Sequence, residues 1–434
     1  MNDDWSSRRL HFVGVGGAGM SGLALVARAL GAQVTGSDRA ASPYAARLRE
    51  QGIVPVIGHA AENVPAGAEV VYSTAVPASN PERRAAAGRE LHRADLLGEI
   101  TRLRRCIAVT GTHGKTTTAA MIVHALCTCG LDPSYLVGAE LSTGTNAAWG
   151  SGEWVVVEAD ESDRSLLKLD PDIAVLTNAE LDHHSTYASR LDLEATLAEF
   201  MGRAQHAIVW DRPALRALCP QGAVAYDAAA PVLGPGGARF RWRELCVTLG
   251  VPGAHNAINA AGALEACVLA GADPARAAAA LAGFHAARRR FERVGESPGG
   301  AVVYDDYAHH PTEVAATLAA ARTLAPDRLI AVFQPHLYSR TRALAGAFGA
   351  ALAAADLVVV VAVYPARERA ADFPGVSGRL VAASAAEAKG GGEVAWLPDL
   401  GDAERFLRAT LRAGDLCLTM GAGDVDSLAR ALTR

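Results

Sequence analysis

Short apolar runs rich in valine, isoleucine and leucine alternate along the chain with longer segments in which apolar residues recur at helical spacing. Short continuous apolar runs are typical of strands buried on both faces, as in parallel sheets. These runs end in glycine or polar residues, and such strand ends hold the ligands of open α/β sheets. The predicted strands are residues 10–14, 33–36, 70–77, 106–110, 155–157, 173–177, 301–305, 329–333, 357–363 and 416–419.

This alternation predicts an α/β protein, and a length of 434 residues suggests about three domains. We expect boundaries near residues 103 and 287, which gives domains at 1–103, 104–287 and 288–434. The segment 211–243 is less regular, and its stretch 231–237, rich in proline and glycine, predicts a loop.

Composition excludes several classes of protein. The formal net charge of −5 argues against nucleic acid as the main partner. No apolar stretch reaches about 18 residues, so no membrane-spanning helix is expected. The acidic N-terminus lacks the apolar core of a signal peptide, and the seven cysteines lack metal-site spacing. We therefore expect a cytoplasmic protein with reduced cysteines; its oligomeric state is not readable from the sequence.

A predicted strand and a predicted helix, 116–129, flank the stretch Gly111-Thr-His-Gly-Lys-Thr-Thr117. Strand, glycine loop, lysine and helix together cradle a polyphosphate, because backbone N–H groups and the helix N-terminus face the anion. A hydroxyl that follows the lysine can hold Mg²⁺. The longer P-loop pattern has glycine where Val109 stands, so the match is incomplete. The alternative is a glycine turn with an exposed lysine, but the chain contains only three lysines and keeps Lys115 here.

A second glycine-rich turn follows the first predicted strand. It contains G-x-G-x-x-G within 14–19, and the next strand delivers Ser37 and Asp38 about 20 positions further on. This fingerprint indicates a diphosphate at a helix N-terminus and a ribose hydroxyl at a carboxylate. NAD, FAD and a nucleotide-sugar diphosphate all satisfy it, and a glycine-rich packing turn is the simpler alternative. Ser73 and Thr74, at another strand end, are further candidate contacts.

Carboxylates crowd the end of the strand at 155–157, in the run Glu158-Ala-Asp-Glu-Ser-Asp163. A charge cluster is usually a solvated face. This cluster, however, follows a core strand in a domain that already has a phosphate loop, where a Mg²⁺ ligand is expected. The next strand opens onto His183 beside acidic residues. A lone histidine is more often structural, but His183 is a candidate second metal ligand.

The last third of the chain predicts a doubly wound sheet whose strand ends carry polar or glycine residues. Before it, His255 and Asn259 stand near the start of a predicted helix, where they either face a base or phosphate or cap the helix. The three consecutive arginines at 288–290 lie at the second predicted boundary. Such a run is usually surface, but at a hinge it can close onto an anionic ligand.

Seven stretches, in order along almost the whole chain, resemble the Mur ligases. The phosphate loop is shared by all Mur ligases and by folylpolyglutamate synthases, whereas 158–163 and 305–311 are more specific to the alanine-adding members. The seven stretches are 14–22, 111–117, 158–163, 289–292, 305–312, 333–341 and 419–424.

The resemblance implies an N-terminal Rossmann-like domain for a UDP-sugar, a central P-loop ATPase-like domain with a parallel sheet, and a C-terminal Rossmann-like domain for the amino acid. It implies ligation of L-alanine to the lactyl carboxylate of UDP-N-acetylmuramate through an acyl phosphate, with ATP and two Mg²⁺ ions. On this interpretation the first glycine turn holds the UDP diphosphate and not NAD.

The resemblance also implies a role for each matching residue. The catalytic residues are Lys115, Glu158, His183, His309 and Arg340, with His309 as a candidate base for the alanine amine. The ATP contacts are Gly111, Thr112, His113, Gly114, Lys115, Thr116, Thr117, His255, Asn259, Arg289 and Arg290. The UDP-sugar contacts are Gly14, Gly16, Gly17, Ala18, Gly19, Ser37, Asp38, Ser73 and Thr74. The metal ligands are Thr116, Glu158 and His183, and the amino-acid contacts are Tyr307, His309, His336 and Arg340.

Two features depart from the family pattern. No lysine lies between Lys168 and Lys389, so the carbamylated lysine that bridges metals in other Mur ligases is absent. Leu337 follows His336 where some relatives have arginine.

The alternative functions are a sister ligase for another amino acid or a peptide, an NAD-dependent oxidoreductase suggested by the first glycine turn alone, and a nucleotide-binding regulator without turnover.

Overall fold

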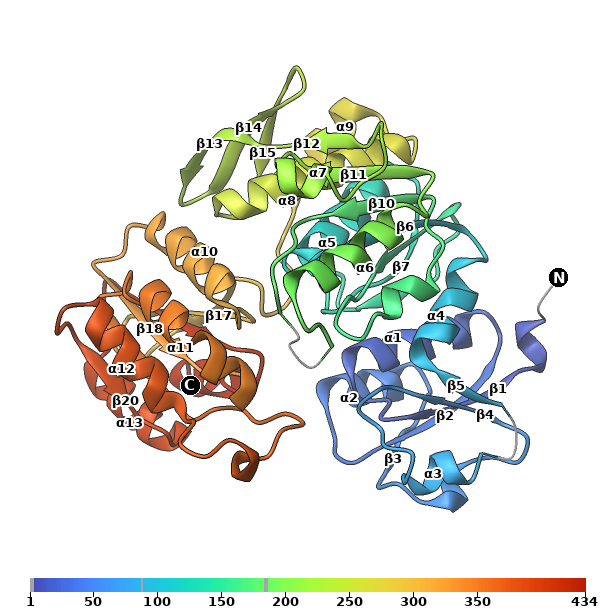
Figure 1. Cartoon of the computed structure of the whole chain (residues 1–434), viewed down its shortest axis with the longest axis horizontal. Coiled ribbons are helices and arrows are strands. Elements are labelled where there is room, and N and C mark those ends of the chain that lie inside the picture. Colours follow the sequence, from blue (N-terminus) through green and yellow to red (C-terminus); the bar gives the residue numbers. More distant parts are fainter. Residues whose placement is uncertain (1–3, 87–88, 183–185) are drawn as a thin grey trace. The chain divides into compact units, whose positions relative to one another are not determined.

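The computed structural model describes residues 4–86, 89–182 and 186–434 (Figure 1). Within these residues the chain forms three mainly parallel sheets flanked by helices, and one small antiparallel sheet. The α/β class predicted from the short apolar runs is therefore confirmed. No helix in the described residues is long and apolar enough to cross a membrane.

The first sheet contains five parallel strands in the order β3-β2-β1-β4-β5. The strand order reverses at β1, so the carboxyl ends of β1, β2 and β4 meet at one edge, where such sheets bind ligands. The short strand β5 is not among the predicted strands, because three residues are too few to show a period. The elements are β1 (Arg9–Val13), α1 (Ala18–Ala29), β2 (Gln33–Asp38), α2 (Pro43–Glu50), β3 (Val56–Ile57), β4 (Glu69–Tyr72), α3 (Pro81–Arg84), β5 (Glu90–His92) and α4 (Arg93–Thr101).

The second sheet has seven strands in the order β12-β11-β10-β6-β9-β7-β8, parallel except for the β7–β8 pair. The register places Val109 of β6 opposite Glu158 of β9 and opposite Val175 of β10. The loop that follows β6 therefore lies between the ends of two neighbouring strands. The elements are β6 (Arg105–Thr110), α5 (Lys115–Thr128), β7 (Ser134–Leu136), β8 (Ala147–Ala148), β9 (Trp154–Glu158), β10 (Ile173–Leu176), α6 (Arg190–Met201), β11 (His206–Trp210), α7 (Pro213–Arg216), β12 (Val224–Tyr226), α8 (Ala254–Leu269) and α9 (Pro274–Ala280).

The third sheet is a small antiparallel one, formed by β13 (Ala229–Gly234), β14 (Gly237–Trp242) and β15 (Leu245–Leu249). The prediction of a loop at 231–237 was wrong, because β13 and the start of β14 cover most of it. Proline is tolerated there since β13 is an edge strand, where a missing N–H breaks no ladder, and the register shifts between Ala229 and Val232.

The fourth sheet has six strands in the order β16-β17-β21-β18-β19-β20, parallel except for the β16–β17 pair. One apolar core joins it to α10, α11 and α12, and another joins its opposite face to α13 and α14. This is the doubly wound arrangement predicted from the strand pattern. The elements are β16 (Glu292–Glu296), β17 (Val302–Asp306), α10 (Pro311–Arg322), β18 (Arg328–Phe333), α11 (Tyr338–Leu352), β19 (Leu357–Val360), α12 (Gly378–Ala388), β20 (Val394–Trp396), α13 (Leu400–Thr410), β21 (Asp415–Met420) and α14 (Asp426–Leu432).

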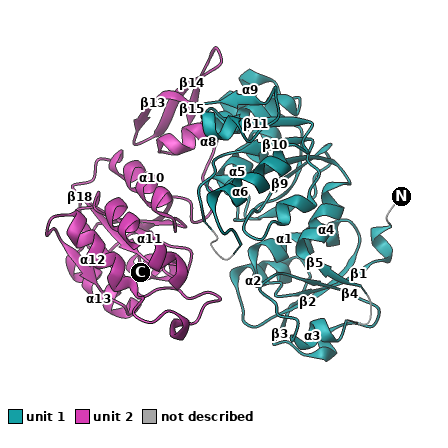
Figure 2. Ribbon diagram, in the orientation of Figure 1, with its two compact units in different colours: residues 1–227, 259–281 teal, residues 228–258, 282–434 magenta. Residues whose placement is uncertain are grey.

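The chain divides into two compact units, residues 1–227 with 259–281, and residues 228–258 with 282–434 (Figure 2). The first unit holds the first and second sheets. A single apolar core includes Phe12 and Leu23 of the first sheet region and Val155 and Phe200 of the second. The domain boundaries expected near residues 103 and 287 stay predictions.

A buried carboxylate lies beneath the strand-end edge of the first sheet, where the nucleotide contacts are predicted. Glu82, in α3, is fully buried and accepts hydrogen bonds from the Ser37 hydroxyl and from Asn63 Nδ2 (2.6 Å). Its Oε2 also lies 3.2 Å from His59 Nδ1 and 3.5 Å from His11 Nε2. Burial raises the pKa of Glu82, but the hydrogen bonds from His11, Ser37 and Asn63 outweigh it and lower that pKa to about 2.

The backbone of Ser37 connects this cluster to the first glycine turn. The Ser37 carbonyl accepts hydrogen bonds from the N–H groups of Gly14 (2.8 Å) and Val15 (3.0 Å). Glu82 holds the Ser37 side chain while Ser37 holds the start of the turn, so the buried carboxylate sets the position of the turn.

Replacing Glu82 by glutamine is expected to lower the free energy of unfolding by about 1–3 kcal/mol at pH 7, because the buried donors lose a charged acceptor. The folded-state pKa of about 2 lies below the ordinary value of 4.5, so ionised Glu82 stabilises the fold above about pH 4.5. That contribution is lost as the pH falls toward 2. Urea unfolding of both proteins across this range should show the difference shrinking; Glu62→Gln, at an exposed site nearby, is the control. A difference that stays constant with pH would contradict the assignment.

Candidate active site

The first glycine turn, between β1 and α1, is shaped by close backbone contacts. Gly14 has φ +78°, and the Gly16 N–H donates to Asp38 Oδ2 (2.8 Å). The Ser42 hydroxyl donates to the Gly16 carbonyl (2.9 Å), and a Cβ at position 16 would lie 2.7 Å from that hydroxyl oxygen. Helix α1 begins after Gly17, whose place at the N-cap supplies no side-chain hydrogen bond. The first N–H groups of α1 therefore suit an anion.

The other predicted UDP-sugar contacts lie at the same edge of the sheet. The carboxylate of Asp38 and the hydroxyl of Ser37 are bonded within the turn and its support. Ser73, half-buried, and Thr74, exposed, follow β4, which pairs with β1. The structure thus brings these four residues to one strand-end edge with the glycine turn. Their contacts with a nucleotide stay predictions.

The phosphate loop depends on two glycines with positive φ. Gly111 has φ +121° and Gly114, the N-cap of α5, has φ +81°. A Cβ at Gly111 would lie 2.3 Å from Thr177 Oγ1, and one at Gly114 would lie 2.7 Å from Asn259 Oδ1. At these two positions no residue with a side chain fits without displacing its neighbours. Asn259, predicted as an ATP contact, reaches the loop from α8.

The end of β10 braces the same loop. Asn178 accepts from the His113 N–H through Oδ1 (2.9 Å) and donates Nδ2 to the His113 carbonyl (2.9 Å). The Thr112 hydroxyl donates to the Glu180 carbonyl (2.8 Å) and accepts from the Glu180 N–H (2.9 Å). Asn178 is not among the predicted site residues, although it directly follows a predicted strand next to the loop.

Lys115 places a cation at the mouth of the loop. Its Nζ donates to the Gly111 carbonyl (2.7 Å), the Thr112 carbonyl (3.3 Å) and Glu161 Oε2 (2.7 Å). Burial lowers the pKa of Lys115, but the charges of Glu161 and Asp160 outweigh it and raise that pKa above its ordinary value. Lys115 is therefore protonated at neutral pH.

Thr116 and Glu158 form a pair of oxygen donors beside the loop. The Thr116 hydroxyl donates to Glu158 Oε2 (3.0 Å), and the Gly138 N–H donates to Glu158 Oε1. A hydroxyl and a carboxylate at this spacing fit Mg²⁺, which prefers hard oxygen ligands. Thr117, on the same turn of α5, is half-buried. His183, the predicted second metal ligand, lies outside the described residues.

The carboxylates of the acidic run, residues 158–163 at the end of β9, contact three different partners. Glu158 contacts Thr116, and Glu161 pairs with Lys115. Asp160 and Asp163 pair with Arg93, at 3.0 and 3.2 Å from its Nη2. Burial raises the pKa of Asp160, but Lys115 and Arg93 outweigh it and hold that pKa well below its ordinary value. Arg93 is not among the predicted site residues, because no local pattern relates residues 67 positions apart.

The predicted amino-acid contacts gather at the strand ends of the fourth sheet. The Tyr307 and His309 rings are 5.3 Å apart, and those of His309 and His336 are 6.0 Å apart. Arg340 is 3% exposed, with Nη1 at 3.1 Å from His336 Nδ1. Tyr364 stacks on His336 with 5.8 Å between ring centroids. Tyr364 was not predicted, although it directly follows the strand expected at 357–363.

The geometry around His309 and Leu337 is unusual in two respects. His309 Nδ1 lies 3.0 Å from the Tyr307 carbonyl; donating there makes Nε2 the acceptor nitrogen. Leu337 has φ +69°, a strained value for a residue with a side chain, and its N–H donates to the Tyr364 carbonyl (2.9 Å). This backbone turn places His336 and the start of α11 so that Arg340 reaches back to His336.

Arg289 is engaged within the C-terminal domain. Its guanidinium donates to Asp305 Oδ2 (2.9 Å) and to the carbonyls of Gly421 (2.6 Å) and Gly423 (3.0 Å). It also lies over the Tyr307 ring, as does Arg290. These bonds join the end of β17 to the loop after β21. The predicted contact of Arg289 or Arg290 with the γ-phosphate stays a prediction.

His255 lies one helical turn before Asn259 on α8. Burial lowers the pKa of His255 to about 4, although the charge of Glu313 acts in the opposite direction. The imidazole is therefore neutral at pH 7. Its predicted contact with ATP stays a prediction.

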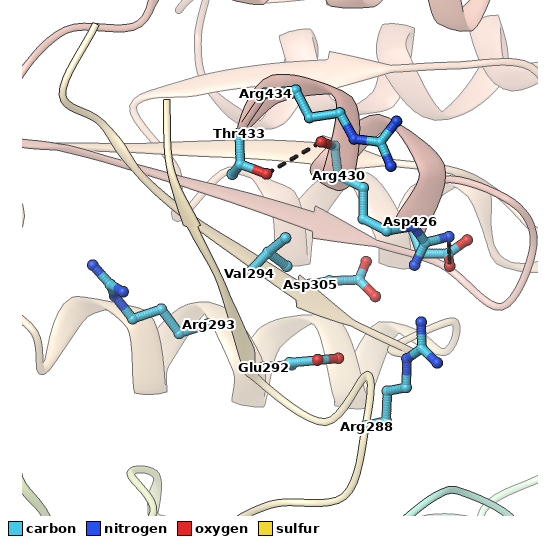
Figure 3. A pocket seen from close by; sticks show the side chains of 9 residues that line it. All are labelled: Arg288, Glu292, Arg293, Val294, Asp305, Asp426, Arg430, Thr433 and Arg434. Carbon is cyan, nitrogen blue, oxygen red and sulfur yellow. Dashed lines mark hydrogen bonds and ion pairs between the residues drawn. The ribbon is translucent and has the colours of Figure 1, made fainter. Parts of the chain in front are cut away.

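A separate cavity of about 290 Å³ lies between β16, β17 and α14 (Figure 3). Acidic and basic side chains share its wall, and Arg430 pairs with Asp426 (2.5 Å). None of the ligand contacts predicted from the sequence lines it. The lining residues are Arg288, Glu292, Arg293, Val294, Asp305, Asp426, Arg430, Thr433 and Arg434.

Family models match the chain in three consecutive segments. The catalytic domain of the Mur ligase family matches residues 9–105, and the Mur ligase middle domain matches residues 109–267. The glutamate ligase domain of the Mur ligases matches residues 289–423.

Relatives and solved structures match nearly the whole chain. A UDP-N-acetylmuramate–L-alanine ligase of Acidithiobacillus ferrooxidans is 44% identical over 97% of this chain and 96% of its own. A ligase of the same name from Rubrobacter xylanophilus is 45% identical over 96% of this chain and 97% of its own. The structure of a UDP-N-acetylmuramate-alanine ligase from Thermotoga maritima matches with a TM-score of 0.85 at 28% identity, covering 98% of each chain. A murein peptide ligase from Psychrobacter arcticus shares the fold, with a TM-score of 0.72 at 23% identity over 98% of each chain. From its three matching domains and these relatives, the chain belongs to the Mur ligase family.

Proposed function

We propose that the chain joins L-alanine to the lactyl carboxylate of UDP-N-acetylmuramate in peptidoglycan precursor synthesis, converting ATP to ADP and phosphate. The observation that carries this proposal is the phosphate loop with Lys115, Thr116 and Glu158 in the same compact unit as the first glycine turn. Relatives at 44% and 45% identity named as this ligase support the choice of substrates.

The reaction requires activation of a carboxylate, which is anionic and whose oxygen is a poor leaving group. Transfer of the γ-phosphoryl group breaks its bond to ADP and joins it to a lactyl oxygen, giving an acyl phosphate. The neutral amine of alanine then attacks the acyl carbon, and the C–O bond to phosphate breaks. The protein contributes mainly positioning and charge stabilisation to the first step.

In this proposal the loop 111–117 and Lys115 bind the β- and γ-phosphates, and Asn259 and His255 face the adenine. Thr116 and Glu158 would hold Mg²⁺, which would neutralise charge on the transferred group, and His183 would be the ligand of a second ion. Arg290, or Arg289, meets the γ-phosphate.

For the amino acid, we assign Arg340 to the alanine carboxylate, because a guanidinium matches its geometry. His309 Nε2 accepts the proton of the alanine ammonium, since Nδ1 faces the Tyr307 carbonyl. Tyr307 and His336 line the same region.

The UDP diphosphate is assigned to the first glycine turn, residues 14–19, with Ser37, Asp38, Ser73 and Thr74 around it.

A cytoplasmic location belongs to the same proposal. The seven cysteines are free thiols, which is the usual state in a reducing compartment.

Phosphate release from ATP and Mg²⁺ is expected only when UDP-N-acetylmuramate and L-alanine are both present. The assay adds each of the twenty amino acids in turn, with and without the UDP-sugar. Turnover with another amino acid alone would assign the chain to a sister ligase. The absence of turnover together with NAD binding would mean that the first glycine turn serves another chemistry.

Lys115→Met is expected to lower phosphate release by about 100- to 1000-fold, because the β- and γ-phosphates lose their fixed cation. The chain offers a matched control in Lys168→Met, which removes an exposed lysine paired with Asp95. Circular dichroism checks that both variants are folded. Undiminished release by the Lys115 variant would contradict the phosphate-loop assignment.

Thr116→Ala is expected to raise the Mg²⁺ concentration for half-maximal activity by about 10- to 100-fold, since one oxygen donor and its contact with Glu158 are lost. Saturating Mg²⁺ should recover part of the rate. The control is Glu153→Gln, which changes an exposed residue directly before β9, the strand that ends at Glu158. An unchanged Mg²⁺ requirement in the Thr116 variant would place the metal elsewhere.

A further inference from the structure

Arg93 lies at the junction between the N-terminal sheet and the acidic run of the central sheet. It is the first residue of α4, and its Nη2 donates to Asp160 Oδ2 (3.0 Å) and Asp163 Oδ2 (3.2 Å). Its Nη1 lies 3.6 Å from the position of a Cβ built on Gly19. One guanidinium therefore faces both the first glycine turn and the run that follows Glu158.

This arrangement differs from an ordinary surface ion pair. The side chain of Arg93 is 24% exposed, and those of Asp160 and Asp163 are 34% and 16% exposed. The two carboxylates are also fixed by the chain itself, because the Ser162 N–H donates to Asp160 (3.0 Å) and the Ser165 N–H donates to Asp163 (3.0 Å). Both acceptors are thus held in place to receive one guanidinium.

A second contact joins the central sheet to the start of α1. Asn146 is 1% exposed and donates Nδ2 to the Ala18 carbonyl (2.7 Å). Asn146 belongs to the β7–β8 connection, which also supplies the Gly138 N–H to Glu158. The start of α1 is therefore linked to the surroundings of Glu158 by two routes, one through Asn146 and one through Arg93.

Lys115 and Arg93 share the charge of the acidic run. Lys115 pairs with Glu161, and Arg93 pairs with Asp160 and Asp163 on either side. When Lys115 turns toward ATP phosphates, as the proposed function requires, Arg93 stays paired with Asp160 and Asp163. The Arg93 side chain then holds the acidic run beside the first glycine turn.

We propose that Arg93 is a positioning residue for the ligation, which holds the acidic run against the first glycine turn and so fixes the UDP-sugar site relative to the phosphate loop. This inference rests on the proposed function. Arg93 acts on the geometry of the two bound substrates, so its loss affects the rate of the bound complex more than ATP binding itself.

The test compares Arg93→Met, Arg93→Lys and Asp163→Asn with Arg102→Met in the full-length protein. Arg102, at the other end of α4, bridges to Asp170 (3.1 Å) and is 56% exposed, so it is a matched control outside the acidic run. The measurements are kcat, the KM values for UDP-N-acetylmuramate, ATP and alanine, the Kd for ADP and the thermal midpoint.

Arg93→Met is expected to lower kcat by about 10- to 100-fold, the cost of misplacing two reactants, with the Kd for ADP unchanged. Arg93→Lys should recover part of this loss, because an ammonium reaches one carboxylate. The kcat of Asp163→Asn should lie between those of Arg93→Met and Arg93→Lys. Arg102→Met should keep kcat within about twofold of the wild type, because exposed ion pairs contribute little. If Arg93→Met does not fold, the lysine and asparagine variants carry the same test.

A kcat of Arg93→Met within about twofold of the wild-type value would overturn the inference. If Arg93→Met does not fold, kcat values within about twofold of the wild type in both Arg93→Lys and Asp163→Asn would overturn it. Equal losses in the Arg93 and Arg102 variants, tracking the thermal midpoint, would reduce Arg93 to a structural contact and also overturn it. A wild-type protein without turnover dependent on sugar and alanine would overturn the proposed function first. The wild-type control therefore separates the two failures.

Discussion

The register between β6 and its two neighbours is the constraint on which the rest of the central site depends. Because Val109 lies opposite both Glu158 and Val175, the loop after β6 has a carboxylate on one side and the Thr177–Asn178 strand end on the other. The glycines of the loop then approach Thr177 and Asn259 so closely that a side chain has no space. A one-residue slip would turn Glu158 to the opposite face of the sheet.

The carboxylates of the acidic run beside this loop have cationic partners from two different helices. Lys115 and Arg93 form ion pairs with the acidic run, and neighbouring carboxylates raise the pKa of each cation against the effect of burial. Buried charges are costly unless paired, so the run is ordered by its partners as much as by its backbone. The same pairing joins the N-terminal sheet to the central sheet within one compact unit.

The C-terminal domain uses different means to hold its polar side chains. Arg289 occupies its donors with Asp305 and with the carbonyls of Gly421 and Gly423, which fixes the strand ends of β17 and β21 together. The strained backbone of Leu337 and the stacking of Tyr364 on His336 then organise the residues around Arg340. Support of this kind suits the amino-acid site that we propose for these residues.

Sequence alone determined the α/β class, the buried strands and both glycine turns, because valine-rich runs, strand-end glycines and helical spacing are local signals. It also singled out Lys115, Thr116 and Glu158, which stand at strand ends or helix starts within short motifs and lie together beside the loop; their roles in binding stay predictions. It missed β5 and β13, since a three-residue strand and an edge strand with proline carry little periodicity. Only the tertiary structure decided that Arg93 meets Asp160 and that Glu82 supports Ser37, because these partners are 67 and 45 positions apart and no local pattern relates them.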